Sequence, residues 1–130
     1  LTQCLAKRAA HILKLHVKRP RIEPKTSAIR RGELVELFFF ARFHASLGQE
    51  SALQEALKEV IVPSREEAGC LGIHAFRSTS DPRLFFIHSR WKDEAAFEYH
   101  ATLPHTVRFL ERATQLIDHA LDTTRTTLIA

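Results

Sequence analysis

The chain is poor in the residue types that mark several common classes of protein. Its 130 residues include only two cysteines and four glycines, and no apolar run approaches the roughly 20 residues that a bilayer span needs. Cys4 and Cys70 form neither a disulfide framework nor a zinc motif, and the glycines are too few for a phosphate-binding loop. Neither His-x-His nor His-Glu-x-x-His occurs. We therefore expect a soluble, cytoplasmic protein with reduced thiols, no metal site and no membrane partner.

Basic residues are concentrated at the start of the chain. Residues 1–32 hold nine Lys or Arg and the single acid Glu23, a net charge of +8, whereas residues 33–130 hold ten bases and fourteen acids. A nucleic-acid-binding surface is not divided in this way, so we expect no nucleic-acid partner. The chain begins without Met, and three explanations of residues 1–32 remain open: a transit peptide, a basic arm, or a remnant of cloning. We predict one domain over residues 33–130, preceded by this basic extension.

Apolar periodicity predicts the first elements of that domain. Residues 33–43, ELVELFFFARF, have the composition of a strand that is apolar in both registers, which predicts cover on both faces. Ser46 and Gln49 have capping-box spacing and precede a helix, which Pro63 is expected to bend or end before Gly69. The apolar stripe of this helix consists of Leu53, Ala56, Leu57, Val60 and Ile61.

The sequence of the second half of the domain predicts a β-hairpin, two more helical segments and a last strand. CLGIHAFRS and LFFIHSRW, joined by TSDPR, are typical of a β-hairpin. Asp93 opens a short helix, and Pro104 suits the first position of the next one. Val107, Leu110 and Ile117 should line that helix. The Thr-rich residues 121–130 predict a closing strand.

The order strand, helix, strand, strand, helix, strand predicts an α+β, ferredoxin-like βαββαβ fold with a four-stranded antiparallel sheet. Its helices cover one face of the sheet. The other face carries Phe38, Phe40 and Phe86 and needs a partner. A second copy of the chain is the simplest partner, so we expect a homodimer through the sheet faces, with His74 and His88 near the seam.

One long segment resembles a known family. Residues 66–110 combine a Glu-x-Gly-Cys-Leu-Gly stretch, an Asp-Pro hairpin, a strand that ends in Trp, and a helix with a His before a Pro-His pair. This pattern resembles the antibiotic biosynthesis monooxygenase family, and the resemblance extends over residues 33–130. It implies a dimeric α+β barrel that binds small, flat, quinol-like or polycyclic molecules between its helices and sheet. Several members oxygenate such substrates with molecular oxygen and without metal or flavin, so no cofactor is implied. Others degrade haem, isomerise a signalling sugar or have no known activity.

Oxygenation without a cofactor requires a base and a dry cavity. A deprotonated phenol or anthrone can pass an electron directly to oxygen, and His is the natural base near neutral pH. By the matching motif positions we predict Trp91, His100 and His105 as the catalytic set, with His100 as the base. An aromatic cavity should hold the ring, and Arg42 or His105 should clamp a polar group. The predicted substrate-binding residues are Phe40, Arg42, His44, Phe76, Phe85, Ile87, Ser89, Phe97 and Phe109.

These assignments have structural alternatives. Trp91 also suits a core anchor, His100 a buried hydrogen-bonding role, and His105 a solvated helix start. Arg42 and His44 also suit charge pairing at the strand edge.

The sequence also departs from the family pattern. Family members commonly carry an acid two residues before the Trp, where this chain has Ser89. The haem-degrading branch uses an Asn and a Trp where Ala41 and His100 fall, which argues against haem degradation. A non-catalytic binding module and an isomerase or decarboxylase remain as alternatives. A cavity below about 300 Å³ would favour the binding module.

Overall fold

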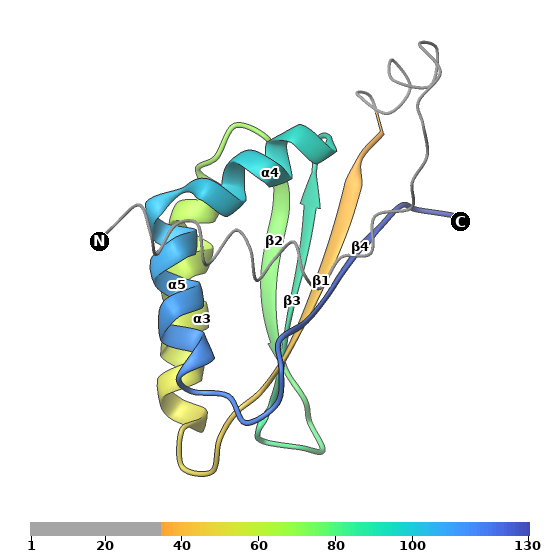
Figure 1. Cartoon of the computed structure of the whole chain (residues 1–130). Coiled ribbons are helices and arrows are strands. Elements are labelled where there is room, and N and C mark those ends of the chain that lie inside the picture. Colours follow the sequence, from red (N-terminus) through yellow and green to blue (C-terminus); the bar gives the residue numbers. More distant parts are fainter. Residues whose placement is uncertain (1–34) are drawn as a thin grey trace.

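The computed structural model describes residues 35–130, so the predictions for residues 1–32 lie outside the described residues. Four strands form one antiparallel sheet in the order β2-β3-β1-β4, and the helices pack against a single face of it (Figure 1). This is the predicted ferredoxin-like arrangement, with its second helix divided in two. In chain order the elements are β1 (Leu37–His44), α3 (Glu50–Arg65), β2 (Cys70–Arg77), β3 (Leu84–Trp91), α4 (Glu94–Thr102), α5 (Pro104–Thr114) and β4 (Asp122–Thr126).

Strand β1 directs alternate side chains to the two faces of the sheet. Leu37, Phe39, Ala41 and Phe43 are buried on the face that the helices cover, which we call the inner face. Phe40 lies on the opposite, outer face and is 49% exposed. No element of residues 35–130 packs on the outer face, so the predicted cover of that face depends on a partner. A covering partner remains a prediction.

Helix α3 packs on the inner face through the predicted stripe, all five residues of which are buried. Its ends differ from the prediction. The helix begins at Glu50 after Gln49, and Ser46 does not cap it, because a turn through Gly48 (φ 83°) separates Ser46 from the first helical residue. Pro63 lies inside the helix, which continues to Arg65. Only two residues of the helix follow Pro63, so the missing backbone N–H of Pro63 affects only the last turn of α3.

Capping residues explain where helices α4 and α5 begin. The Asp93 carboxylate accepts a hydrogen bond from the Ala96 N–H (2.7 Å), and Pro104 stands in the first turn of α5, as predicted. Helix α5 ends at Thr114, so the prediction that Ile117 lines it is wrong. Ile117 instead forms a bridge with Ala45 in the loop before β4.

Strand β4 is shorter than predicted, since its ladder with β1 reaches only the Thr126–Phe38 pair. Its Arg125 reaches the inner face and fastens α4 to the sheet. The guanidinium pairs with Glu94 (2.8 Å) and Glu98 (2.7 Å) and lies 4.8 Å from the centre of the Phe97 ring. The side chain is only 6% exposed, so these contacts hold in a poorly solvated position. Helix α4 is thereby held over the sheet end that carries Trp91.

Gly69, in the loop between α3 and β2, lies directly against α4. A Cβ at this position would stand 2.4 Å from the Ala96 Cβ, whereas one at Gly72 meets nothing within 4 Å. We expect Gly69→Ala to lower the free energy of unfolding by about 1–3 kcal/mol, since α4 must shift to relieve the overlap. Gly72→Ala is the matched control and should change it much less. Urea unfolding measures both, and equal losses would show that the close approach of Gly69 to α4 is not what costs stability.

Candidate functional site

A small cavity lies between the inner face of the sheet and the helices. Its volume is about 40 Å³, and its lining comes from all four strands of the described sheet, from α3, α4 and α5, and from the loop before β4. The lining is mainly apolar, with Phe39, Phe97 and Phe109 among its rings. Among its few polar groups, the Thr123 hydroxyl is buried and has no partner in the described part of the chain. The cavity has room for a few water molecules and not for an aromatic ring.

Next to this cavity, one carboxylate joins two histidines. Glu67, in the loop after α3, accepts with one oxygen, Oε2, from both rings: Nδ1 of His100 lies at 2.7 Å and Nε2 of His105 at 2.8 Å. His100 comes from α4 and His105 from the first turn of α5, so three segments meet at one oxygen. The side chains of Glu67 and His100 are 9% and 10% exposed, and that of His105 is 17% exposed. We call these three residues the Glu67 cluster.

The environment fixes the ionisation of Glu67. Burial alone raises the pKa of its carboxyl, but the hydrogen bonds and charges of His100 and His105 outweigh burial and hold that pKa below its ordinary value. Glu67 is therefore a carboxylate at neutral pH. Its second oxygen, Oε1, is buried and has no hydrogen-bond partner among residues 35–130.

His100 is the member of the cluster that lines the cavity. Its ring lies 4.4 Å from the Trp91 ring and 5.9 Å from the Phe97 ring, measured between centroids. Because Nδ1 faces Glu67, a neutral ring carries its proton there and leaves Nε2 as an acceptor. No residue within 35–130 hydrogen-bonds that nitrogen in the structure. A carboxylate that orients an imidazole in this way is the usual arrangement of a general base.

The other two members of the cluster face surface hollows. His105 lines a groove of about 280 Å³ bordered by α3 and α5, and Glu67 lines a hollow of about 320 Å³ beside α4. The cluster thus borders the cavity through His100 and the two hollows through His105 and Glu67.

Trp91, predicted as a member of the catalytic set, does not line the cavity. It is fully buried, donates from Nε1 to the Ser89 hydroxyl (2.9 Å), and packs edge-on against Phe97. Its link to the site is its contact with the His100 ring.

The predicted substrate-binding residues divide among several regions. Ile87, Ser89, Phe97 and Phe109 line the cavity. Phe85 is buried on the inner face outside it. Phe40, Arg42 and Phe76 lie on the outer face, where the sheet separates them from His100, so they do not share its cavity. The assignment of these three residues to the substrate site conflicts with the outer-face position that the sequence already predicted for Phe40.

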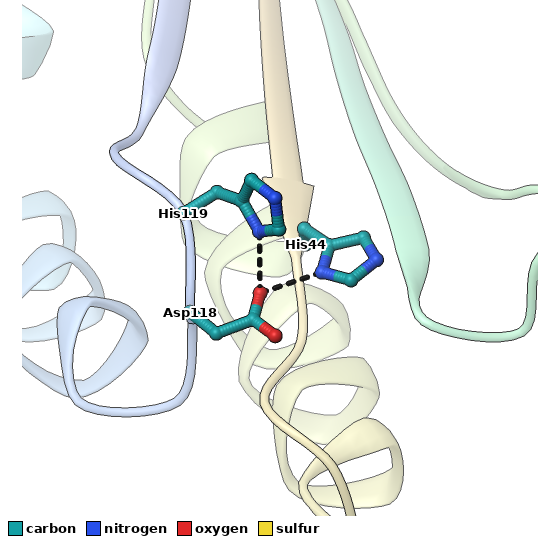
Figure 2. Close-up of side chains that lie close together, drawn as sticks. All are labelled: His44, Asp118 and His119. Atoms are coloured by element: carbon teal, nitrogen blue, oxygen red, sulfur yellow. Dashed lines mark hydrogen bonds and ion pairs between the residues drawn. The ribbon is translucent and has the colours of Figure 1, made fainter.

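His44 takes part in a second cluster at the far end of β1. Its Nδ1 lies 2.5 Å from Oδ1 of Asp118, and Nδ1 of His119 lies 2.6 Å from the same oxygen (Figure 2). This is the charge pairing that we considered for His44. The hydrogen bonds from His44 and His119, with the charges of His44 and Arg83, lower the pKa of the Asp118 carboxyl to about 2. Donor atoms within each of the two clusters lie within 4.8 Å of one another, the spacing of a three-ligand metal site.

Sequence reasoning missed Glu67 and Asp118. Glu67 belongs to the Glu-x-Gly-Cys-Leu-Gly stretch, but its partners stand 33 and 38 positions later, so no short motif joins them. Asp118 lies 74 positions from His44. An acid just after a predicted helix, two residues before Gly69, was the local signal for Glu67.

Cys70 is half-buried, and burial raises the pKa of its thiol, which does not favour a reactive thiolate.

Within residues 35–130, no helix combines the length and hydrophobicity that a bilayer crossing requires.

The sequence and structural comparisons with known proteins agree on one family. The sequence pattern of the antibiotic biosynthesis monooxygenase family matches residues 37–112. The chain is 31% identical over 80 residues to a Bacillus subtilis protein named putative monooxygenase YcnE, an alignment that covers 62% of this chain and 83% of that one. PA3566 from Pseudomonas aeruginosa superposes with a TM-score of 0.69 at 30% identity, covering 74% of this chain and 96% of that one. Rv0793 from Mycobacterium tuberculosis has the same fold, with a TM-score of 0.70 at 22% identity over 73% of this chain and 96% of that one. The chain therefore belongs to the antibiotic biosynthesis monooxygenase family.

Proposed function

We propose that the chain is a monooxygenase that oxidises a small phenolic or quinol substrate with molecular oxygen and needs no metal or flavin. Family membership and the likeness to YcnE support an oxygenase in general terms. The observation that carries the specific proposal is the hydrogen bond between Glu67 and Nδ1 of His100 beside a mainly apolar cavity.

In this proposal His100 removes the proton of a substrate hydroxyl. Glu67 holds the ring in the required tautomer and stabilises the imidazolium that forms. The resulting phenolate passes electrons to oxygen. For a quinol, one oxygen atom enters the ring, the other leaves as water with two substrate hydrogens, and the product is a hydroxyquinone. His105, on the same carboxylate, is a second proton carrier at the mouth of the groove.

The small volume of the cavity imposes a condition on this chemistry. At about 40 Å³ it is far below the roughly 300 Å³ at which small-molecule pockets begin, so a ring binds only when the helices and sheet move apart. The same volume favours a second candidate function, a non-catalytic module whose hollow is filled by its own side chains. Oxygen consumption distinguishes the two.

Oxygen uptake with a panel of simple quinols is the test. We expect His100→Ala to lower the wild-type rate by about 10²–10⁴-fold, the usual contribution of a general base. Glu67→Gln should lose less, because the imidazole remains. Glu66→Gln is the matched control, since Glu66 is the exposed neighbour of Glu67. Circular dichroism verifies that each variant is folded.

Three other outcomes contradict the proposal. Equal rates for the parent and His100→Ala would remove His100 from the mechanism. Quinol binding without oxygen uptake would favour the non-catalytic module, and turnover without oxygen would favour an isomerase or decarboxylase.

We further propose that two copies of the chain pair through their outer sheet faces. Phe40, Phe76 and Phe86 remain 49%, 52% and 36% exposed there, and the ring of His88 lies 4.8 Å from that of Phe40. An apolar patch of neighbouring strands is typical of an interface. A two-fold pairing of identical faces buries these rings without requiring any other partner.

A further inference from the structure

The cluster of His44, Asp118 and His119 lies far from the proposed active site. His44 ends β1 and pairs with Leu84, whereas Leu37 begins it and pairs with Trp91. An eight-residue strand separates these ends by about 23 Å. The cluster is therefore independent of His100, and nothing in the proposed oxygenation uses it.

Backbone contacts hold the three side chains together. The Asp118 N–H donates to the His44 carbonyl (3.1 Å), and the Ser46 N–H donates to the Leu116 carbonyl (2.8 Å). Ala45 and Ile117 form the bridge between these two bonds. The loop that carries Asp118 and His119 is thus fixed against the end of β1, and the donor atoms are arranged before any ligand arrives.

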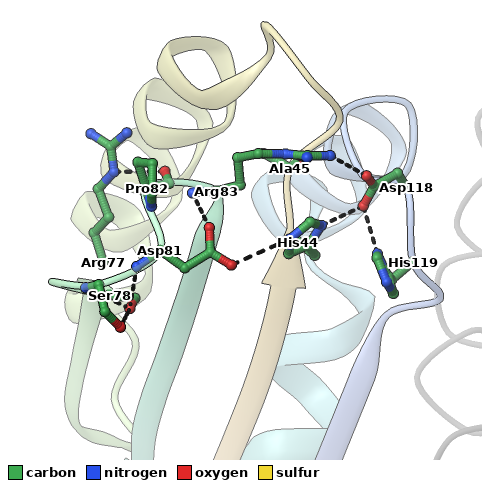
Figure 3. Close-up of polar contacts among 10 residues, drawn as sticks. His44, Ala45, Arg77, Ser78, Asp81, Pro82, Arg83, Asp118 and His119 are labelled. Carbon is green, nitrogen blue, oxygen red and sulfur yellow. Dashed lines mark hydrogen bonds and ion pairs between the residues drawn. The ribbon is translucent and has the colours of Figure 1, made fainter.

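Two charged residues next to the cluster, Arg83 and Asp81, orient its potential metal-ligand atoms (Figure 3). Arg83 pairs with Oδ2 of Asp118 and also donates to the Ala45 carbonyl (2.9 Å), which leaves Oδ1 directed at the two rings. On its other side, Nε2 of His44 lies 3.5 Å from Oδ2 of Asp81. A ligating histidine commonly has a carboxylate near its second nitrogen, where that carboxylate fixes the ring and raises its basicity.

We propose that Nδ1 of His44, Nδ1 of His119 and Oδ1 of Asp118 bind a divalent transition metal of the zinc class. Two imidazoles and one carboxylate are a donor set that such ions prefer. Tetrahedral bonds of about 2.0–2.2 Å place ligand atoms roughly 3.3–3.5 Å apart. The nitrogens now lie 2.5 and 2.6 Å from Oδ1, so a shift of less than about 1 Å, within the reach of side-chain rotation, makes room for the ion.

The surroundings leave a coordination position open. The side chains of His119 and Asp118 are 69% and 33% exposed, and His44 and His119 border a hollow of about 210 Å³. Of the nearest charges, Asp81 and Asp118 are acidic and Arg83 is basic, a net charge of −1 that favours a cation. With three protein ligands, water or a small anion completes the shell.

Zinc titration of the untagged full chain by calorimetry, with Co²⁺ absorption as the spectroscopic probe, tests this site. We expect His119→Ala to remove one bound metal per chain, together with the Co²⁺ d–d bands of that site. Asp118→Asn should weaken binding at least about 10-fold, since it removes the anionic ligand. The control Glu67→Gln should retain the metal, because Glu67 belongs to the other cluster.

The difference between the parent and His119→Ala isolates this site from any metal bound through Cys4, His11 or His16. His119 is exposed, so its replacement leaves the core unchanged. The same zinc stoichiometry and affinity in the parent and in His119→Ala would overturn the proposal. Loss of metal in Glu67→Gln, with retention in His119→Ala, would assign binding to the Glu67 cluster instead.

Discussion

Replacing Trp91 by alanine is expected to lower the free energy of unfolding by about 3–5 kcal/mol, the usual cost of emptying a buried aromatic site. The indole is fully buried, packs on Phe97 and His100, and makes a hydrogen bond to Ser89 that the variant leaves unpaired. A domain of this size has roughly 5–15 kcal/mol of stability, so the loss is a large share of it. Urea unfolding followed by circular dichroism measures the change.

Tyr99→Ala serves as the control for the loss of an aromatic ring. Tyr99 stands on α4 like Phe97 but is 65% exposed, so its removal should cost less than about 0.5 kcal/mol. If Trp91→Ala costs less than about 1 kcal/mol, the indole is not a core anchor, and a direct role in ligand binding becomes the better explanation.

Replacing Phe40 by aspartate is expected to convert the proposed homodimer into monomers. The side chain points away from the core, so the fold should survive, but the new carboxylate would be buried between two sheets without a partner. An unpaired buried charge costs at least about 3 kcal/mol, which weakens association more than 100-fold. Sedimentation velocity at micromolar concentrations measures the oligomeric state.

Leu47→Asp is the matched control for that variant. Leu47 is 82% exposed in the loop between β1 and α3, away from the outer face, and should leave the dimer intact. A parent chain that sediments as a monomer at every concentration would contradict the pairing of sheet faces. Dissociation by both variants would place the interface elsewhere.

The fold could be predicted because its signals are local and repeated. The stripe of α3 and the Asp-Pro hairpin each follow from a few neighbouring residues, and the order of elements leaves few topologies open. The helix ends were predicted less well. Ser46 lost its capping role to a glycine turn, and Pro63 was accommodated because the helix ends two residues later.

The site was predictable only in part, because its geometry depends on long-range packing. His100 could be singled out from its position after Trp91 and within the family pattern, and the structure does place its ring beside the Trp91 ring. Glu67 could not, since only the packing of α4 against the loop at Gly69 brings its carboxylate to that ring. Phe40 was predicted on the outer face, where the structure has it, but it was also assigned to the substrate site together with Arg42, although a residue on that face cannot reach His100.

The small volume of the cavity has a consequence for how tightly any guest can be held. An aromatic ring binds only to molecules in which the cavity is expanded. The measured Kd therefore equals the intrinsic Kd of the expanded form divided by the fraction of molecules that are expanded. If one molecule in about 100 is expanded, the apparent affinity falls by about 100-fold. Substitutions that trim Phe97 or Phe109 could then tighten binding while removing contacts, since they relieve the cost of making space.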